Sequence, residues 1–364
     1  MTEFQKRIQE VAKRLTQHSL DCLFITPGAD LRYFTGYNAL PLERLTCLAI
    51  RNDGEAILFV PHLELPAAQV HEPERSGIQL HSWQETENPY ERLHQLVGSA
   101  TSVAVNDVMW TQKAFGIRDA FSTEVHLAGN LLSDLRSIKT PAEIEAIYAA
   151  GVAIDQVHNN MHQWIRVGRT EREVGRDIAD AIISSGHATV DFVIVASGPN
   201  GASAHHEVSD RVIQQNEPIV VDIGGTMPSG YCSDSTRMYA CGDVSTEFMS
   251  HYEILQNAQA RAVADARIGM TGADVDAISR SILAEADLAD YFVHRTGHGL
   301  GLETHEEPYI VATNHQPLVA GNVFSIEPGF YIPGQYGARI EDIVYLTESG
   351  AVSVNNSSHN LRVL

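Results

Sequence analysis

Residues 297–306 of this chain read Gly297-His298-Gly299-Leu300-Gly301-Leu302-Glu303-Thr304-His305-Glu306. His298 lies between two glycines, which leave room for a close approach to its imidazole ring. A single histidine among apolar residues is more often a structural group than a ligand. On its own, this string therefore leaves both interpretations open.

Four acidic residues interrupt apolar segments in a similar way, each in a segment typical of a strand or a strand end: Asp222, Asp234, Glu327 and Glu341. A buried carboxylate without a partner costs several kcal/mol, so each should be paired or bound to a cation. Four carboxylates that converge with His298 form an anionic cage suited to two divalent metal ions. The chemistry that this set indicates is metal-assisted hydrolysis.

The same acidic residues also have less specific interpretations. Asp222 stands just before a Gly-Gly pair, so it could be a turn residue. Glu327 and Glu341 could be charges at exposed strand ends. Their apolar neighbours favour buried strands instead: Ile326, Ile340 and Ile343.

Composition bounds the class of protein. The 364 residues are 44% apolar and 20% charged, which predicts a globular chain with room for two domains. The net charge is −21 and no basic cluster occurs, so nucleic acid is not expected as a partner. The N-terminus lacks a signal-peptide core and no apolar run is long enough for a membrane span, so no membrane association is expected. Four cysteines without metal-site spacing are typical of the reducing cytoplasm.

The N-terminal third has the pattern of an α/β domain, predicted over residues 1–134. Residues 2–18 predict an amphipathic helix, and short apolar runs predict strands at 23–25, 48–50, 56–60 and 103–105. A second domain is predicted over 135–364. Its first helix should begin after Thr140, with Pro141 at the first helical position and Glu143 closing a capping box, and should end near Ile165.

The second domain contains a weak internal repeat. Val167-Gly168-Arg169-Thr170 corresponds to Ile268-Gly269-Met270-Thr271 at an offset of 101 residues. A second capping box, Thr170 with Glu173, follows the first copy. The strands after the first copy carry the two aspartates, and those after the second carry His298 and the two glutamates. A pseudo-twofold arrangement with the site between the halves is expected.

Five consecutive motifs resemble those of the pita-bread metallopeptidases, a family that includes proline dipeptidase, aminopeptidase P and methionine aminopeptidase: Val221–Gly225, Ser233–Arg237, Gly297–Glu306, Ser325–Gly329 and Ala338–Asp342. Asp30–Tyr37 resembles a segment of the N-terminal domain of prolidases and creatinases. The implied fold is α+β, a pita-bread catalytic domain preceded by a creatinase-like α/β domain. The 12-residue gap from Asp222 to Asp234 is one longer than is usual, and the turn at 225–230 should absorb the extra residue.

The resemblance implies a role for nine residues. The metal ligands would be Asp222, Asp234, His298, Glu327 and Glu341, with Asp234 and Glu341 bridging two ions. Glu327 would also carry the proton of the attacking water. His205, His294 and His305 would bind the substrate and stabilise the tetrahedral intermediate. The Ser-Asp pair at 209–210 sets the register on His205 rather than His206. Arg339 would orient Glu341 and the substrate.

The implied activity is that of an Xaa-Pro dipeptidase, which cleaves short peptides with proline in second position. Prolidases often carry an Arg shortly after the His-Glu motif, but this chain has none between Arg295 and Arg339. An Xaa-Pro aminopeptidase that acts on longer peptides therefore remains the alternative. A creatinase-like hydrolase or an inactive binding module would predict lost ligands, and all five are present.

The resemblance also bears on the cofactor and the assembly. An oxygen-rich ligand set favours two Mn ions, with Co or Zn as alternatives. A cytoplasmic homodimer is expected, in which residues 1–130 narrow the entrance so that short peptides are cut.

Overall fold

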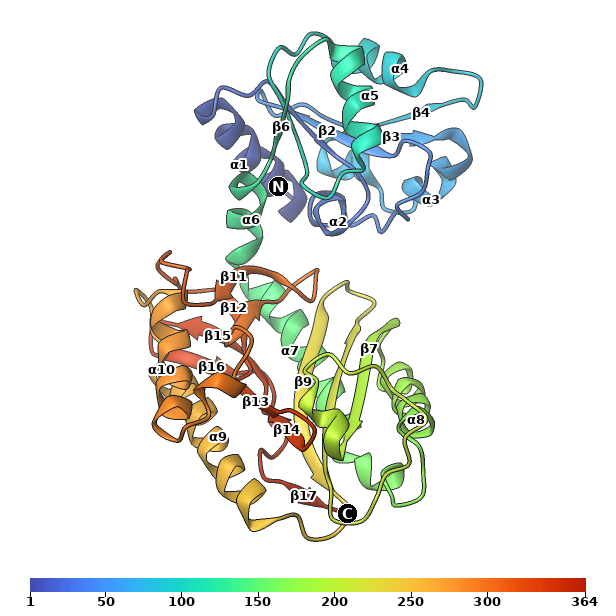
Figure 1. Ribbon diagram of the computed structural model, residues 1–364. Coiled ribbons are helices and arrows are strands. Elements are labelled where there is room, and N and C mark those ends of the chain that lie inside the picture. Colours follow the sequence, from blue (N-terminus) through green and yellow to red (C-terminus); the bar gives the residue numbers. More distant parts are fainter. The chain divides into compact units, whose positions relative to one another are not determined.

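The computed structural model describes residues 1–364, which divide into two compact units, Met1–Arg136 and Ser137–Leu364. Figure 1 shows the elements of both units. The assignment of residues 1–134 and 135–364 to separate domains stays a prediction.

The first unit is built on one mixed six-stranded sheet in the order β4-β3-β2-β1-β5-β6. Its strands are β1 (Cys22–Ile25), β2 (Cys47–Arg51), β3 (Ala56–Pro61), β4 (Ile78–Trp83), β5 (Val103–Val105) and β6 (Val125–Leu127). Its helices are α1 (Glu3–Gln17), α2 (Ala29–Thr35), α3 (Leu65–Gln69), α4 (Pro89–Val97), α5 (Thr111–Phe121) and α6 (Asn130–Ser137), with 3-10 turns η1 (His62–Glu64) and η2 (Pro73–Ser76). The four strands and the first helix predicted from sequence are confirmed.

Local sequence explains how α1 forms. Thr2 and Gln5 make a reciprocal capping box at its start. Ile8, Val11 and Leu15 recur at helical spacing and are buried, which holds one face of the helix against the unit.

The second unit contains two main sheets and a hairpin. The strands are β7 (Thr189–Ser197), β8 (Pro218–Thr226), β9 (Cys232–Ala240), β10 (Gly297–Gly299), β11 (Glu306–Ile310), β12 (Val323–Ile326), β13 (Gly329–Ile332), β14 (Tyr336–Arg339), β15 (Asp342–Thr347), β16 (Gly350–Ser353) and β17 (Arg362–Val363). The orders are β17-β9-β8-β7 and β11-β10-β12-β15-β16, and β13 pairs with β14. The helices are α7 (Pro141–Asn159), α8 (Glu171–Ser184), α9 (Thr246–Asp265) and α10 (Gly272–Glu285), with 3-10 turns η3 (Met161–Gln163), η4 (Gly198–Ala202) and η5 (Ala289–Tyr291).

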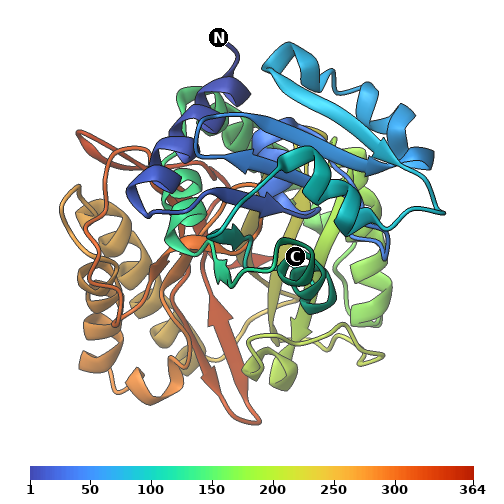
Figure 2. The same ribbon diagram turned by 90° about the horizontal axis from the view of Figure 1, so that it is seen from above.

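The two halves of this unit follow the same plan. Helices α7 and α8 pack on the β7–β9 sheet, and α9 and α10 pack on the other sheet. In Figure 2 the orange helices α9 and α10 and the yellow-green α8 lie on opposite sides of the unit. Both α8 and α10 begin with a capping box, formed by Thr170 with Glu173 and by Thr271 with Asp274. The 101-residue repeat thus corresponds to a repeated structural unit.

Helix α7 begins as predicted but ends earlier. Thr140 caps it, Pro141 occupies the first turn and Glu143 completes the capping box. The prediction that it continues to Ile165 is wrong, because the helix ends at Asn159 and a 3-10 turn follows. Asparagine side chains compete for backbone hydrogen bonds, and the Asn160 amide donates to Gln156 O at 2.8 Å.

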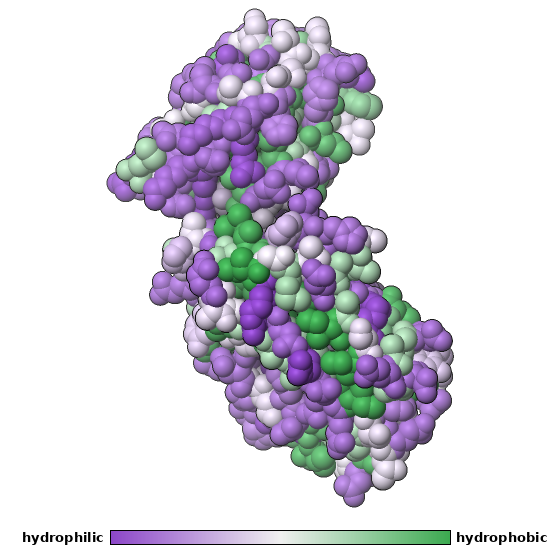
Figure 3. All heavy atoms as spheres, turned by 90° about the vertical axis from the view of Figure 1, so that its left-hand side faces the viewer, coloured by the Kyte–Doolittle hydropathy of each residue, from purple (hydrophilic) through white to green (hydrophobic).

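The surface shown in Figure 3 carries mostly hydrophilic side chains, with apolar ones in smaller patches. None of the helices has both the length and the apolar composition that crossing a membrane requires.

Candidate metal centre

Two neighbouring strands place Asp222 and Asp234 on one face of a sheet. β8 and β9 are antiparallel, and Asp222 pairs with Thr236 while Asp234 pairs with Gly224. Residues two apart on a strand share a face, so the two carboxylates lie diagonally adjacent. β8 continues to Thr226 and β9 starts at Cys232, so the turn absorbs the extra residue and both aspartates stay on strands.

His298 occupies the middle of the three-residue strand β10. A Cβ atom at Gly297 would overlap the carbonyl of Ser325, and one at Gly299 would overlap the carbonyl of Glu307. The flanking glycines therefore let β12 and the start of β11 approach the backbone on either side of His298. They serve the packing of strands as well as the access to the imidazole expected from the sequence.

Strand pairing also brings the two glutamates together. β12 pairs with β15 so that Ile326 lies opposite Asp342. Glu327 directly follows the first strand, and Glu341 directly precedes the second, so they flank this pair. Glu341 is buried, with only 1% of its surface exposed, which excludes the interpretation as a surface charge.

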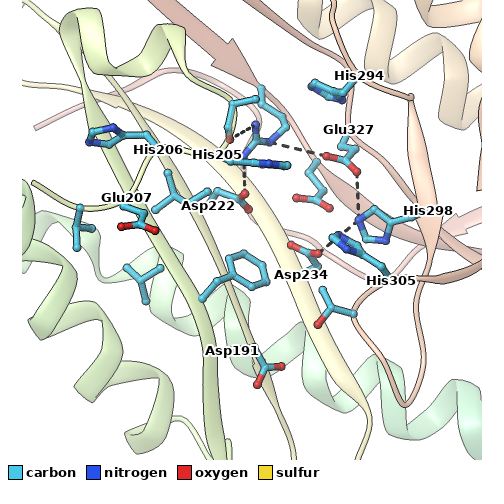
Figure 4. Close-up of a pocket in the computed structure, with 18 of the residues that line it drawn as sticks. Asp191, His205, His206, Glu207, Asp222, Asp234, His294, His298, His305 and Glu327 are labelled. Atoms are coloured by element: carbon cyan, nitrogen blue, oxygen red, sulfur yellow. Dashed lines mark hydrogen bonds and ion pairs between the residues drawn. The ribbon is translucent and has the colours of Figure 1, made fainter. Parts of the chain in front are cut away.

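The five predicted ligands converge as three overlapping groups, each with donor atoms within 4.8 Å of one another. These are Asp222 with Asp234 and Glu341, His298 with Glu327 and Glu341, and Asp234 with His298 and His305. Asp234, Glu341 and His298 each belong to two groups. Of these three, only the two carboxylates have a pair of oxygen atoms with which they could serve two ions. Figure 4 shows Asp234 and Glu327 pointing toward His298.

One cavity of about 890 Å³ contains all nine residues singled out from the sequence. The lining includes His205, Asp222, Asp234, His294, His298, His305, Glu327, Arg339 and Glu341. Their individual roles stay predictions, but the fold brings every one of them to the same site.

Several carboxylates are buried close together in this cluster, so each one disfavours the charged form of its neighbours. Burial, together with the neighbouring carboxylates, raises the pKa of Asp234 and of Glu341 well above the usual range. Burial acts in the same direction on Glu327, but the hydrogen bond and charge of His298 outweigh it and lower the pKa of Glu327 to about 2. The charged forms of Asp234 and Glu341 therefore need further positive charge in the site.

Two oxygen atoms show where that charge fits. Asp222 Oδ1 and Glu341 Oε1 are buried and have no hydrogen-bond partner in the protein. Buried polar atoms are almost always partnered, so such oxygens indicate an absent ligand. Carboxylate oxygens with one imidazole nitrogen are suitable donors for divalent cations. The residues present therefore fit a metal centre.

Arg339 is the cation that the protein itself supplies to the cluster. Its guanidinium donates to Asp222 Oδ2, to the Thr236 hydroxyl at 3.1 Å, to the Tyr331 hydroxyl and to Ala204 O at 3.2 Å. Thr236 in turn donates to Glu341 at 2.9 Å. Arg339 thus orients Asp222 directly, and it reaches Glu341, the carboxylate expected from the sequence, only through Thr236.

The histidines around the cluster differ in how they are held. His294 Nδ1 lies 2.7 Å from Arg295 O, and its Nε2 lies 2.9 Å from the Tyr331 hydroxyl, so both ring nitrogens are engaged. His305 packs edge-on against His298 with ring centroids 4.1 Å apart, and burial lowers the pKa of His305 to about 4. His205 is exposed to the pocket and its ring makes no hydrogen bond to the protein.

His206, the neighbour of His205, is engaged elsewhere. Its Nε2 lies 2.8 Å from the Glu171 carboxylate, and Figure 4 shows it directed away from the cluster around His298. The structure therefore leaves His205, rather than His206, available at the site.

Four further residues that hold this site were not predicted from the sequence. Tyr331 links His294 to Arg339, and Thr236 links Arg339 to Glu341. Ser325 donates to Glu327 at 3.1 Å and accepts from the backbone of His298 at 2.9 Å. Glu171 holds the segment that carries His205. Thr236 and Ser325 could have been found, because each carries a hydroxyl two residues from a predicted ligand along the strand direction. No sequence signal marked Tyr331 or Glu171.

Comparison with known proteins identifies the family. Residues 145–348 match metallopeptidase family M24, and residues 7–138 match the creatinase/prolidase N-terminal domain. The chain belongs to metallopeptidase family M24. It is therefore a hydrolase in which a creatinase-like domain precedes the pita-bread catalytic domain along the sequence, as the motifs indicated. Membership implies divalent metal ions at the carboxylate cluster.

M24 relatives match over almost the entire chain. A probable dipeptidase PepE of Mycobacterium tuberculosis is 46% identical over 362 residues, which is 99% of this chain and 96% of the relative. The crystal structure of dipeptidase PepE from Mycobacterium ulcerans has 47% identity and a TM-score of 0.94, covering 99% and 98% of the two chains. A recombinant prolidase from Thermococcus sibiricus has 34% identity and a TM-score of 0.92, with both chains fully covered.

Proposed function

We propose that this M24 enzyme is an Xaa-Pro dipeptidase that works with two divalent metal ions. The observation that carries the proposal is the convergence of four carboxylates and His298 in one pocket, with two buried carboxylate oxygens lacking a partner. The names of the relatives, dipeptidase and prolidase, support the substrate class.

Five residues would hold the ions: Asp222, Asp234, His298, Glu327 and Glu341. Bound there, two ions would supply an activated water and polarise the scissile carbonyl. The predominance of oxygen donors favours Mn, with Co or Zn as alternatives.

The remaining chemistry falls to side chains of the protein. The Glu327 side chain is 14% exposed and faces the pocket, whereas Glu341 is buried more deeply. Glu327 is therefore the carboxylate placed to take the proton of the attacking water and to pass it to the leaving nitrogen. His205 and His305 line the pocket and can donate hydrogen bonds to the substrate. Arg339 keeps Asp222 oriented through their ion pair.

A guanidinium in the pocket supports a dipeptide substrate. Arg295 lines the pocket, and its Cζ lies 4.3 Å from the centroid of the Tyr309 ring, which fixes the side chain by stacking. It forms no ion pair with a carboxylate of the protein. The other two arginines of the pocket do, since Arg172 pairs with Asp210 and Arg339 with Asp222. Arg295 is therefore available for the free carboxylate of a dipeptide, although it precedes the motif histidine instead of following it.

This proposal predicts how turnover depends on the free C-terminal carboxylate of the substrate. With Mn, the enzyme should cleave Ala-Pro faster than its C-terminal amide or Ala-Pro-Ala. Arg295→Gln should raise KM for Ala-Pro by roughly 10–100-fold, since a hydrogen-bonded charge pair contributes about 1.5–3 kcal/mol. The same change should alter KM for the amide by less than about twofold.

Arg172→Gln is the matched control, because it removes a pocket guanidinium that already has a partner. Steady-state kinetics on the three peptides would measure both variants. If wild-type enzyme prefers Ala-Pro-Ala and Arg295→Gln affects all substrates alike, the Xaa-Pro aminopeptidase alternative replaces the dipeptidase.

We also propose that the protein is a cytoplasmic homodimer. All four cysteines are free and buried, as expected in a reducing compartment. Large apolar side chains of the first unit remain exposed in the single chain: Leu40 (67%), Leu42 (41%), Val108 (61%), Trp110 (45%) and Phe115 (51%). Val108 and Trp110 line one groove together with Pro41, which Leu40 and Leu42 flank in sequence. Contiguous apolar surface is typical of an association site.

Sedimentation velocity should therefore give twice the mass of the chain. Trp110→Asp should shift the protein toward monomer, because a charge at an apolar interface must be desolvated. Val70→Asp is the control, since Val70 is 78% exposed on the same unit but outside this group. A wild-type monomer, or equal dissociation of both variants, would contradict the proposal.

A further inference from the structure

The segment that carries His205 has little backbone support of its own. Residues 204–208 lie between η4 and β8 without helix or strand, and they form no hydrogen bond between backbone groups. A segment of this kind should sample many conformations. The position of the His205 ring must therefore be set by side chains outside the segment.

Glu171 is the side chain best placed to do so. It is fully buried at the first position of α8, and its carboxylate collects hydrogen bonds from both ends of the segment. Before the segment, Ser197 donates through its backbone N–H and its hydroxyl, both at 2.8 Å, and Asn200 donates at 3.1 Å to each oxygen. Within and after it, His206 Nε2 lies at 2.8 Å, and Ser209 donates through its hydroxyl at 2.6 Å and its N–H at 3.3 Å.

The carboxylate is in its charged form in this network. Burial on its own would raise the pKa of Glu171, but the hydrogen bonds from Ser209, Ser197 and His206 outweigh it and lower the pKa. An anion that only accepts hydrogen bonds organises several donors at once.

A second charged group, the Arg339 cation, anchors the segment on the other side of His205. Arg339 donates to Ala204 O at 3.2 Å, and Glu171 holds His206. The residues immediately before and after His205 are thus each fixed by a buried charged group. His205 itself is left without a protein partner and faces the pocket.

We propose that Glu171 is the positioning residue of His205: it does not touch the substrate, and it acts on the reaction by holding the segment so that the His205 ring faces the bound peptide. This inference rests on the proposed function, in which His205 contacts the substrate. Displacing a catalytic group by about 1 Å can lower a rate by about 10²-fold, which sets the expected size of the effect.

A double-mutant cycle tests this inference on the full-length, metal-loaded enzyme. Glu171→Gln keeps the side-chain shape but replaces one acceptor oxygen by an NH₂ donor. The groups that donate hydrogen bonds to Glu171 can then no longer all find an acceptor. It should lower kcat for Ala-Pro by roughly 10–100-fold with metal content unchanged. In a His205→Ala background the same change should lower kcat by less than about twofold, because the residue that it positions is gone.

Asp180→Asn is the matched control on the same helix, since Asp180 is exposed and its carboxylate has no hydrogen bond. It should leave kcat unchanged in both backgrounds. If Glu171→Gln does not fold, Ser209→Ala takes its place in the cycle, because it removes one donor and keeps the carboxylate. Its expected effect is smaller, but it should likewise disappear in the His205→Ala background.

Three results would overturn the inference: an equal loss of kcat with and without His205, full kcat in a folded Glu171→Gln enzyme, or loss of the metals. If instead the proposed function is wrong, the wild-type enzyme itself will not cleave Ala-Pro, which distinguishes this outcome from the three above. In that case the cycle is measured on whichever short peptide the wild type hydrolyses.

Discussion

Replacing Asp234 by Asn is expected to remove peptide turnover and to lower metal content below two ions per chain. Asp234 belongs to two of the three donor groups and lies within 3.7 Å of His298 Nε2. In the proposed centre Asp234 would serve both ions. The amide of Asn offers one neutral oxygen in place of two that share a negative charge, so the binding of both ions should weaken. The loss of activity should exceed the roughly 10²–10⁴-fold effect of removing a positioned acid–base group.

Elemental analysis after dialysis against Mn and turnover of Ala-Pro would measure the two effects together. Asp191→Asn is the matched control, because Asp191 lines the same pocket but bonds only to Thr189 and Thr226. It should keep two metals and most of the activity. Chelator-treated wild type should lose activity and regain it with Mn or Co. Full turnover in a rigorously metal-free sample would falsify the dinuclear proposal.

His205→Ala should separate catalysis from metal binding. The imidazole is exposed to the pocket, makes no hydrogen bond to the protein and belongs to none of the donor groups. Its loss should leave both ions bound and the fold intact. Because a positioned hydrogen-bonding group typically contributes 10²–10⁴-fold, kcat should fall by about that factor.

Single-turnover kinetics, metal analysis and thermal melting on the same preparation would measure this. Glu207→Gln is the control, since Glu207 lines the pocket in the same segment and has no partner. It should change kcat little. Loss of metal in His205→Ala would mean that the ring is a ligand, and unchanged kcat would mean that it does not act on the substrate.

Much of the fold follows from short-range sequence signals. The start of α7 was predictable because Thr140 and Glu143 are three residues apart and cap the helix without help from the rest of the chain. The strands β1, β2, β3 and β5 were predictable from apolar runs bounded by turns. The end of α7 was not predicted, because the apolar spacing through Met161 also fits a longer helix. The competing hydrogen bond from the Asn160 side chain to Gln156 O becomes visible only in the structure.

The sequence by itself also determined which residues could form the metal centre. The order of the motifs around Asp222, Asp234, His298, Glu327 and Glu341 was enough to predict the family, which is confirmed. The family could be predicted because its motifs require particular residue types at particular strand positions, and both are visible in the local sequence.

Only the tertiary structure decided which partners those residues have. Tyr331 contacts His294 37 residues away, Glu171 contacts His206 35 residues away, and Thr236 contacts Glu341 105 residues away. Strand register and helix packing bring these pairs together. It also decided that Arg295 has no carboxylate partner and that His206, rather than His205, is bound to Glu171. The physical reason is that a hydrogen bond needs two atoms within about 3 Å, and for residues distant in sequence only the folded chain sets that distance.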